Sequence, residues 1–239
     1  MFELAACIGA WLPILGVTHL VHRGDSLPRI PGRRFRALGR VVARLSPLWE
    51  LGVVGEPPAD IDTRAYVVVA NHESNADPFL LSHLPWDMRW VAKEELFKTP
   101  AVGWLLRLAG DIPLRRGDGE SVREMFATCR ETLAGGLSVM LFPEGTRSKD
   151  GQLRAFKDGA FELAIEAQAP VLPIVVSGTR ECIQKGSFML GEARATARIL
   201  APIETAGLTL ADVAKLRDTV RARIADAIAL TDAPSSPAA

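Results

Sequence analysis

Short runs of β-branched and other apolar residues, each followed by a small or polar turn and then by a helical pattern, constrain this chain more than any other feature. The clearest runs are residues 66–70, 137–142 and 171–176. Runs of this length and composition are typical of strands buried on both faces. Because strands that alternate with helices form layered domains, the sequence predicts an α/β domain with a largely parallel, mixed central sheet flanked by helices.

Other stretches complete this alternation. Pro173 lies inside the run 171–176 and indicates an edge strand or an irregular crossing, because proline has no N–H to donate to a β-ladder. We expect three parts of the chain: N-terminal membrane-associating helices over residues 1–47, the main domain over 48–230, and a disordered tail over 231–239. Further strands are predicted over residues 48–55, 87–92, 110–116 and 195–200, and helices over 78–84, 101–109, 121–133, 161–168 and 208–230.

The N-terminal segment is the most apolar part of the chain, with no charged residue between Glu3 and His19. It is just short of a comfortable membrane span, and Pro13 weakens it as a straight helix. Three interpretations stay open: a helix that dips into one leaflet, a helix that barely spans a bilayer, and a buried core helix. No basic region precedes it and no small-x-small cleavage site follows it, so it does not resemble a signal peptide.

Seven arginines follow between residues 23 and 44. Their spacing becomes helical from residue 32, where Arg33, Arg36, Arg40 and Arg44 share one face. An anionic membrane surface attracts such a helix by about 1 kcal/mol per basic residue, and an ordinary solvated face is the alternative. We expect the protein at the cytoplasmic face of a membrane, the inner membrane in a bacterium, because arginines after a membrane segment stay on that side.

Composition excludes several classes of function. The 239 residues include 28 basic and 28 acidic side chains, so the formal net charge is zero and the chain has no global nucleic-acid signature. Three scattered cysteines form no CxxC pair, which fits a reducing compartment without a disulfide framework or zinc site. We expect no bound metal and no bound cofactor.

The run 66–70 leads into the first chemically notable turn. His72 lies where this strand ends, and Asp77 lies where the next helix begins, as an expected N-cap with Pro78 at the first helical position. That edge of an α/β sheet is where catalytic groups gather. A histidine and an aspartate that flank one turn form a general base and its orienting carboxylate. Taken alone, the pair has a second interpretation as a helix cap beside a polar turn residue.

The second notable turn is residues 142–148, Phe-Pro-Glu-Gly-Thr-Arg-Ser, which follows the run 137–142. A parallel sheet places it on the same edge as His72. Lys93 and the adjacent pair Arg115 and Arg116 add positive charge to that edge. Cations beside a general base predict an anionic substrate that itself carries the nucleophile, such as a phosphate ester with a free hydroxyl.

These residues resemble the motifs of the PlsC-type glycerolipid acyltransferases, the lysophosphatidic acid acyltransferase family. The resemblance covers roughly residues 48–200, with the blocks in the family's order. Arg115 stands where the family often has an acidic residue. The matching residues are His72 and Asp77 in the first block, Gly110, Ile112 and Arg116 in the second, residues 142–148 in the third, residues 171–174 loosely in the fourth, and Lys93 between the first two blocks.

The resemblance implies a membrane-surface acyltransferase of phospholipid biosynthesis. Its acyl donor would be acyl-CoA or acyl carrier protein, and its acceptor a lysophospholipid, 1-acylglycerol-3-phosphate, which becomes phosphatidic acid. Another acceptor, such as a lyso-ornithine lipid or lysophosphoglycerol, stays open as an alternative. A non-catalytic lipid-binding protein of the same fold is a third hypothesis, although a binding module needs no base.

Each candidate residue receives a role in this reaction. We expect His72 to take the proton of the acceptor hydroxyl while that oxygen attacks the thioester carbonyl. Asp77 would hold the other ring nitrogen. The sequence contains no Gly-x-Ser-x-Gly elbow, which argues against a covalent serine route. The residues expected to bind the substrate are Lys93, Arg116 and Arg147 for the phosphate, and Glu144, Gly145 and Thr146 for the acceptor site.

Overall fold

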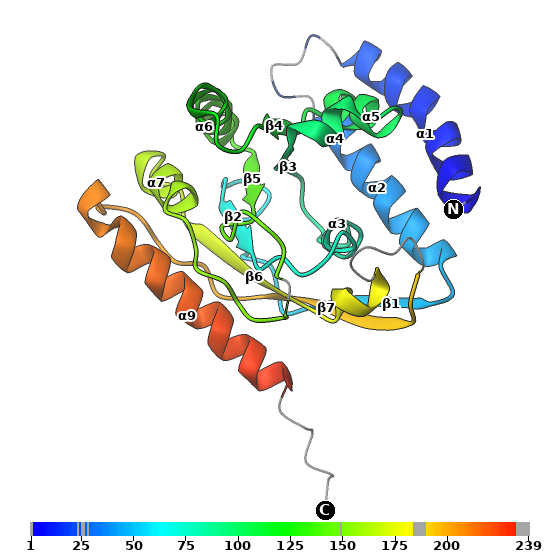
Figure 1. The fold of residues 1–239 in the computed structure, drawn as a ribbon. Helices are drawn as coiled ribbons and strands as arrows, with labels where there is room; N and C mark the ends of the chain where they lie inside the picture. Colours follow the sequence, from blue (N-terminus) through cyan, green and yellow to red (C-terminus); the bar gives the residue numbers. More distant parts are fainter. Residues whose placement is uncertain are drawn as a thin grey trace, which may run out of the picture.

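The computed structural model describes residues 2–22, 24, 27, 29–148, 150–183 and 190–232. Within these residues, seven strands form one mixed sheet in the order β1-β7-β6-β2-β5-β3-β4 (Figure 1). The predicted α/β architecture is therefore confirmed. The strands are β1 (Trp49–Val54), β2 (Val67–Ala70), β3 (Met88–Lys93), β4 (Ile112–Leu114), β5 (Ser138–Leu141), β6 (Val171–Ser177) and β7 (Ala193–Ile199).

Strand direction decides where functional loops meet. β2 pairs in parallel with β5 and β6, β5 with β3, and β3 with β4. β7 runs antiparallel to β6 and parallel to β1. The carboxyl ends of β6, β2, β5, β3 and β4 therefore lie along one edge of the sheet, which is where ligands bind in open α/β sheets.

Helices cover both faces of the sheet. Figure 1 shows α6, α7 and α9 on one side and α3, with α1 and α2, on the other. The described helices are α1 (Phe2–Val21), α2 (Arg29–Leu45), α3 (Asp77–Leu81), α4 (Glu94–Lys98), α5 (Val102–Ala109), α6 (Gly119–Ala134), α7 (Gly159–Glu166), α8 (Thr179–Cys182), the 3₁₀ turn η1 (Leu210–Asp212) and α9 (Val213–Asp232).

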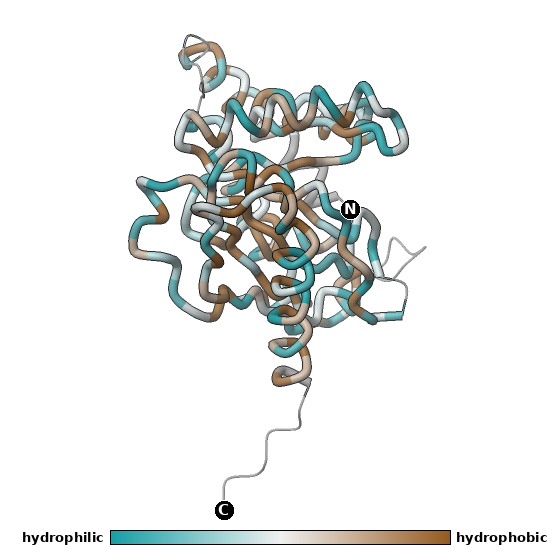
Figure 2. Tube along the Cα trace, turned by 90° about the vertical axis from the view of Figure 1, so that its left-hand side faces the viewer, coloured by the Kyte–Doolittle hydropathy of each residue, from teal (hydrophilic) through white to brown (hydrophobic). Residues whose placement is uncertain are grey.

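β2 explains why this arrangement is stable. Its four residues are completely buried, and successive side chains point to opposite faces. Val67 and Val69 pack with α6, α7 and α9, while Val68 and Ala70 pack with α3. Figure 2 shows the hydrophobic residues of this core gathered in the middle of the molecule. Burial of a valine side chain contributes roughly 1.5–3 kcal/mol, so a strand that is apolar at every position fits only the centre of the sheet.

The N-terminal helices pack against the rest of the protein. Leu15 of α1, Leu38 of α2 and Leu105 of α5 form a small third core. The Trp11 indole N–H donates to the backbone oxygen of Arg34 at 2.8 Å. None of the described helices has the length and hydropathy required to cross a membrane.

The prediction that the basic face of α2 is exposed is wrong for Arg36. This side chain is buried, forms an ion pair with Asp111 and lies 4.1 Å from the centre of the Trp90 ring. The Asp111 carboxylate, itself buried, requires a positive partner, and that requirement turns Arg36 inward. Arg40 is half-buried and donates to the Ser82 backbone oxygen at 2.7 Å. The structure leaves Arg33 and Arg44 exposed, and Arg23 lies outside the described residues.

The Arg36–Asp111 pair gives a stability prediction. Arg36→Met removes the arginine that forms the ion pair with the buried Asp111 carboxylate, and the loss of one partner of a buried pair typically costs about 3–5 kcal/mol. Urea unfolding should show a loss of that size, and Asp111→Asn in the same chain should recover most of it, because the amide oxygen still accepts from the Trp90 backbone N–H. Arg34→Met, on an exposed side chain of the same helix, is the control. A loss of under 1 kcal/mol for Arg36→Met contradicts this reading.

Two further predictions are corrected. β6 lies between β2 and β7, so the edge position suggested by Pro173 is wrong. The antiparallel pairing of β6 with β7 begins at Ile174, opposite Ile199, and the Pro173 carbonyl accepts from Leu200 N at 3.0 Å. The N–H group that Pro173 lacks is therefore not needed for the pairing of β6 with β7. Of the predicted tail 231–239, the first two residues belong to α9 and the others lie outside the described residues.

Candidate active site

Two loops at the carboxyl edge of the sheet are joined to each other. One follows β2 and contains His72, and the other follows the neighbouring strand β5 and contains Glu144. The backbone N–H of His72 donates to Glu144 Oε1 at 2.8 Å, and the backbone N–H of Ser148 donates to the His72 carbonyl at 2.9 Å. The two sequence motifs thus form one structural unit.

His72 and Asp77 are in contact. The distance from His72 Nδ1 to Asp77 Oδ2 is 2.6 Å, and the Asp77 side chain is fully buried while that of His72 is 15 % exposed. The imidazole stacks on Phe142, with ring centres 4.1 Å apart. Among the described residues, none forms a hydrogen bond with His72 Nε2. A carboxylate that accepts from Nδ1–H leaves the Nε2 lone pair as a base open to a ligand.

Asp77 is not the N-cap of α3. It is the first helical residue, and the cap position belongs to Ala76. The Asp77 carboxylate instead faces back along the chain and accepts the N–H groups of Glu73 at 2.9 Å and Ser74 at 3.1 Å. The N-terminus of α3 also attracts the Asp77 carboxylate. The carboxylate nevertheless forms its hydrogen bonds with these two N–H groups and with the imidazole N–H. Asp77 therefore organises the turn that carries His72.

Two polar residues that the sequence analysis missed complete this turn. Asn71 is buried, and its side-chain amide exchanges two 2.8 Å hydrogen bonds with the backbone of Val176, which extends the pairing of β2 with β6. The hydroxyl of Thr179 donates to Asp77 Oδ1 at 2.5 Å. Asn71 directly precedes the motif and was recognisable as a strand-end residue, whereas Thr179 is 102 residues away from its partner.

Glu144 contacts the protein backbone through both carboxylate oxygens. Besides the N–H of His72, it accepts the N–H of Arg154 at 3.2 Å. Burial raises the pKa of Glu144, and these two backbone donors oppose that rise. Glu144 thus ties the β5 loop to the turn that carries His72, and its role in shaping an acceptor site stays a prediction.

Gly145 needs to be glycine for two reasons. Its φ is +66°, a left-handed conformation that other residues rarely adopt. A Cβ at this position would also lie 3.0 Å from Cε of Lys157, whose side chain crosses the loop. Lys157 is an exposed cation beside the motif that the sequence analysis did not identify.

The other predicted cations spread along the same edge. Lys93 ends β3 and is paired with Glu95 at 3.1 Å, while Arg116 follows β4, is exposed, and has no ion pair within the described part of the chain. Adjacent strands are about 4.8 Å apart, so the β3 end lies roughly 10 Å from the β2 end and the β4 end roughly 14 Å. Arg147, half-buried, and Thr146, exposed, lie on the nearer β5 loop.

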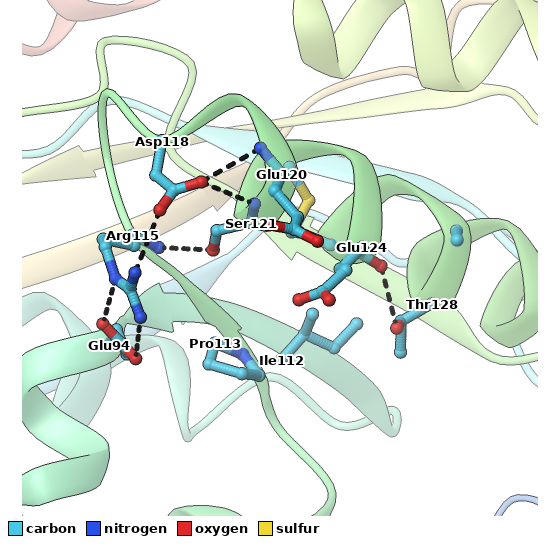
Figure 3. A pocket seen from close by; sticks show the side chains of 11 residues that line it. Glu94, Ile112, Pro113, Arg115, Asp118, Glu120, Ser121, Glu124 and Thr128 are labelled. Carbon is cyan, nitrogen blue, oxygen red and sulfur yellow. Dashed lines mark hydrogen bonds and ion pairs between the residues drawn. The ribbon is translucent and has the colours of Figure 1, made fainter.

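Arg115 is engaged elsewhere. Figure 3 shows its guanidinium between Glu94, at 2.7 and 2.9 Å, and Asp118, at 2.9 Å. The two partners neutralise its charge, and the acidic side chains that line the hollow around them, Glu94, Asp118, Glu120 and Glu124, outnumber the one cation, Arg115. This surface does not suit an anionic substrate. Arg116 is therefore the member of the adjacent pair that is free to bind a ligand.

Glu73 adds an unusual carboxyl beside the histidine. Burial, reinforced by the charge of Asp77, raises the pKa of Glu73 to about 7. Its carboxylate oxygens lie 3.5 Å from Asn71 Nδ2 and 3.5 Å from the Thr179 hydroxyl. At neutral pH this group is close to half protonated.

The Glu73 pKa gives a prediction for stability against pH. Because the folded protein binds this proton more tightly than the unfolded chain, stability falls as pH rises from about 4.5 to about 7. Glu73→Gln removes that loss, so the variant should be more stable than the parent by about 2–3 kcal/mol at pH 8 and equally stable at pH 4.5. Urea unfolding at both pH values measures this. Glu131→Gln, on an exposed side chain of α6, is the control, and equal stabilities of Glu73→Gln and parent at pH 8 contradict the assignment.

Comparison with known proteins places this site in a family. The family model described as Acyltransferase matches residues 55–177, which contain both loops. The chain belongs to the acyltransferase family. Over 142 residues it is 39% identical to the chloroplastic 1-acyl-sn-glycerol-3-phosphate acyltransferase of Arabidopsis thaliana. Over 162 residues it is 38% identical to the 1-acyl-sn-glycerol-3-phosphate acyltransferase alpha of Mus musculus.

The extent of these matches differs between sequence and structure. The two matches cover 59% and 66% of this acyltransferase but only 40% and 57% of the relatives, so the chain spans about half the length of the curated relatives it matches. The crystal structure of the 1-acyl-sn-glycerophosphate acyltransferase PlsC from Thermotoga maritima matches 96% of both chains, with a TM-score of 0.71 and 26% identity. The acyltransferase thus shares that protein's fold across nearly its whole length.

Proposed function

We propose that this acyltransferase moves a fatty acyl group from acyl-CoA or acyl carrier protein to the free hydroxyl of 1-acylglycerol-3-phosphate, forming phosphatidic acid. One observation carries the proposal: the His72–Asp77 pair leaves Nε2 open at a sheet edge that also holds Arg147, Lys93 and Arg116. The printed names of the relatives from Arabidopsis thaliana, Mus musculus and Thermotoga maritima support the same acceptor.

The geometry suits direct transfer. His72 Nε2 accepts the proton of the acceptor hydroxyl as the oxygen attacks the thioester carbonyl carbon. Asp77 stabilises the imidazolium that forms. When the carbon–sulfur bond breaks, the imidazolium returns the proton to the leaving thiolate, so the products are the new ester and a free thiol. No covalent acyl-enzyme is required.

Cations at the edge hold the phosphate of the acceptor. Arg147 lies on the loop nearest to His72, and Lys93 and Arg116 lie at the carboxyl ends of β3 and β4 on the same edge of the sheet. An arginine binds phosphate through two parallel charge-assisted hydrogen bonds. Lys157, whose side chain lies against Gly145, adds positive charge to the same loop.

An apolar cavity beside the catalytic turn accommodates an acyl chain. It has a volume of about 250 Å³ and lies between α2, α3, α5 and β3. Phe79 and Pro78 of α3, the helix that begins with Asp77, form one wall, and Trp90 and Leu105 contribute others. Its walls are almost entirely apolar, which suits the hydrocarbon chain of a lipid substrate.

We propose that the enzyme works at the cytoplasmic face of a membrane, and the exposed apolar surface of α1 and α5 supports this proposal. Val17, Leu20 and Val21 at the end of α1 are 64%, 61% and 72% exposed, and Trp104 of α5 is 57% exposed. α1 packs on α5, so these side chains belong to neighbouring elements. Exposed apolar groups on packed helices stabilise membrane binding in proportion to the area they bury in the interface.

Membrane binding is tested with point variants. Val17→Asp combined with Trp104→Asp should abolish flotation of the purified protein with vesicles that contain anionic lipid, because each carboxylate resists entry into the interface. Leu230→Asp, on the 80% exposed Leu230 of α9, should leave flotation unchanged. Full flotation of the double variant would place the membrane contact on another surface.

The identity of the acceptor is tested by mass spectrometry of the product. Purified protein receives labelled acyl-CoA and, in separate reactions, 1-acylglycerol-3-phosphate, lysophosphoglycerol and a lyso-ornithine lipid. We expect labelled phosphatidic acid as the dominant product. Faster acylation of the lyso-ornithine lipid, which lacks phosphate, would overturn the assignment of the acceptor while keeping the acyltransferase chemistry.

A further inference from the structure

Thr179 lies directly behind the catalytic pair. It is the first residue of α8, which follows β6, and β6 is the neighbour of β2 in the sheet. Its side chain is completely buried, and its hydroxyl donates to Asp77 Oδ1 at 2.5 Å. The other carboxylate oxygen, Oδ2, is the one that contacts His72 Nδ1.

The two oxygens of Asp77 therefore have different partners. Oδ1 receives the Thr179 hydroxyl, while Oδ2 receives His72 Nδ1 and the N–H of Glu73. The N–H of Ser74 is shared between them, at 3.1 Å from Oδ1 and 3.2 Å from Oδ2. The donors on Oδ1 fix the rotation of the carboxylate about its Cβ–Cγ bond. With that rotation fixed, Oδ2 stays in line with the imidazole nitrogen. A carboxylate held on one side only would be free to turn away from the ring.

Thr179 is itself held in place by the sheet. It follows Gly178, which has a φ of +84° and lies so close to the Arg194 carbonyl of β7 that a Cβ would reach within 2.2 Å of it. Two residues earlier, Val176 is paired with the side chain of Asn71. The end of β6 is thus tied to β7 on one side and to the catalytic turn on the other.

We propose that Thr179 is a positioning residue for acyl transfer: through its hydrogen bond to Asp77 Oδ1 it holds the carboxylate in the orientation that keeps His72 active as a base. The proposal rests on the proposed function of His72. It deepens that function, because it assigns a role to the segment after β6, which forms no part of either motif at the ends of β2 and β5.

The charged surroundings of the pair permit a clean test. The titratable and charged groups that face His72, Asp77 or Glu73 come from the catalytic turn, the β5 loop and α8. Thr179→Val keeps all of these side chains and the shape of the Thr179 side chain, but it also removes the 3.5 Å contact of the Thr179 hydroxyl with Glu73, so the variants are also compared in a Glu73→Gln background. These groups are Glu73, Glu144, Arg154, Arg180, Glu181 and Cys182.

The experiment compares three variants of the full-length protein. Thr179→Val removes the hydroxyl, Thr179→Ser keeps it, and Thr205→Val removes the hydroxyl of an equally buried threonine that donates to the Ala169 carbonyl on the far side of the core. We measure kcat and KM for acyl transfer against pH. The titration midpoint of the His72 ring is followed by NMR, with His72→Asn identifying its signal among the four histidines.

Thr179→Val should lower kcat by about 10- to 100-fold with KM changed less than threefold. The acid limb of the pH profile and the His72 midpoint should both move downward, because a carboxylate that turns away from the ring stabilises the imidazolium less. Thr179→Ser should resemble the parent protein, and Thr205→Val should lose stability alone. If Thr179→Val does not fold, Thr179→Ala against Thr179→Ser makes the same comparison.

A Thr179→Val protein with parental kcat and an unmoved His72 midpoint overturns the proposal, as does an equal shift in Thr205→Val. The NMR titration needs no substrate. If the parent protein fails to acylate 1-acylglycerol-3-phosphate, the proposed function fails, but the His72 midpoints of the variants still decide whether Thr179 controls the pair.

Discussion

His72→Ala should lower kcat for acyl transfer by about 10³-fold or more, because it removes the general base from the attacking hydroxyl. The fold should survive. Within the turn, the contacts of His72 to Glu144 and Ser148 run through its backbone, which alanine keeps. The ring is partly exposed and stacks on one neighbour, Phe142, so its loss removes little core packing.

The control for this variant is His83→Ala. His83 lies two residues after the end of α3 and has a ring nitrogen 2.9 Å from the carbonyl of Phe79 in that helix. Acyl transfer by His83→Ala should stay close to the parental rate, and urea unfolding of both variants should show that they are folded. If folded His72→Ala protein keeps a tenth or more of the parental kcat, His72 is not the base.

Asp77→Asn should be nearly as damaging, with kcat lowered by about 10³- to 10⁴-fold and KM little changed. The asparagine oxygen can accept from Ser74 and Glu73 or from Thr179, but its NH₂ group presents a donor where the buried carboxylate presented acceptors. Facing His72 Nδ1, that donor favours the tautomer with the proton on Nε2, which cannot accept a proton from the acceptor hydroxyl. The measurement is steady-state kinetics with 1-acylglycerol-3-phosphate at saturating acyl-CoA.

A comparison with Asp77→Ala separates charge from geometry. Alanine removes every side-chain hydrogen bond of the turn, so this variant should lose stability as well as activity. Asp77→Asn should be more stable than Asp77→Ala, but its activity should be equally low. Parental kcat in folded Asp77→Asn protein would show that His72 needs no carboxylate and would remove the central element of the site.

The parts of the fold that could be predicted from sequence are those fixed by local pattern. Residues 66–70, 137–142 and 171–176 are apolar at nearly every position, and such runs are stable only between two covered faces. Because parallel strands end at one edge, these runs also indicated that His72 and Glu144 would be close. The short helix α4 was missed, since five residues carry too little periodicity to be recognised.

Other features depend on contacts that no local pattern encodes. Helical spacing shows which arginines of α2 share a face, but the buried carboxylate of Asp111 decides that Arg36 turns inward. The N-cap position predicted for Asp77 was reasonable for an aspartate before proline, yet the imidazole and Thr179 redirect its carboxylate. Thr179 itself reaches the site only because β6 and β2 are neighbours in the sheet.

The most direct test of the account is the ratio of two catalytic efficiencies. We compare kcat/KM for 1-acylglycerol-3-phosphate with kcat/KM for monoacylglycerol of the same acyl chain, which differs only in lacking the phosphate. Charge-assisted hydrogen bonds contribute about 1.5–3 kcal/mol each, so the phosphate acceptor should be favoured by about 100-fold or more. Equal efficiencies for the two acceptors would contradict the assignment of this sheet edge as a site for a phosphate-bearing nucleophile.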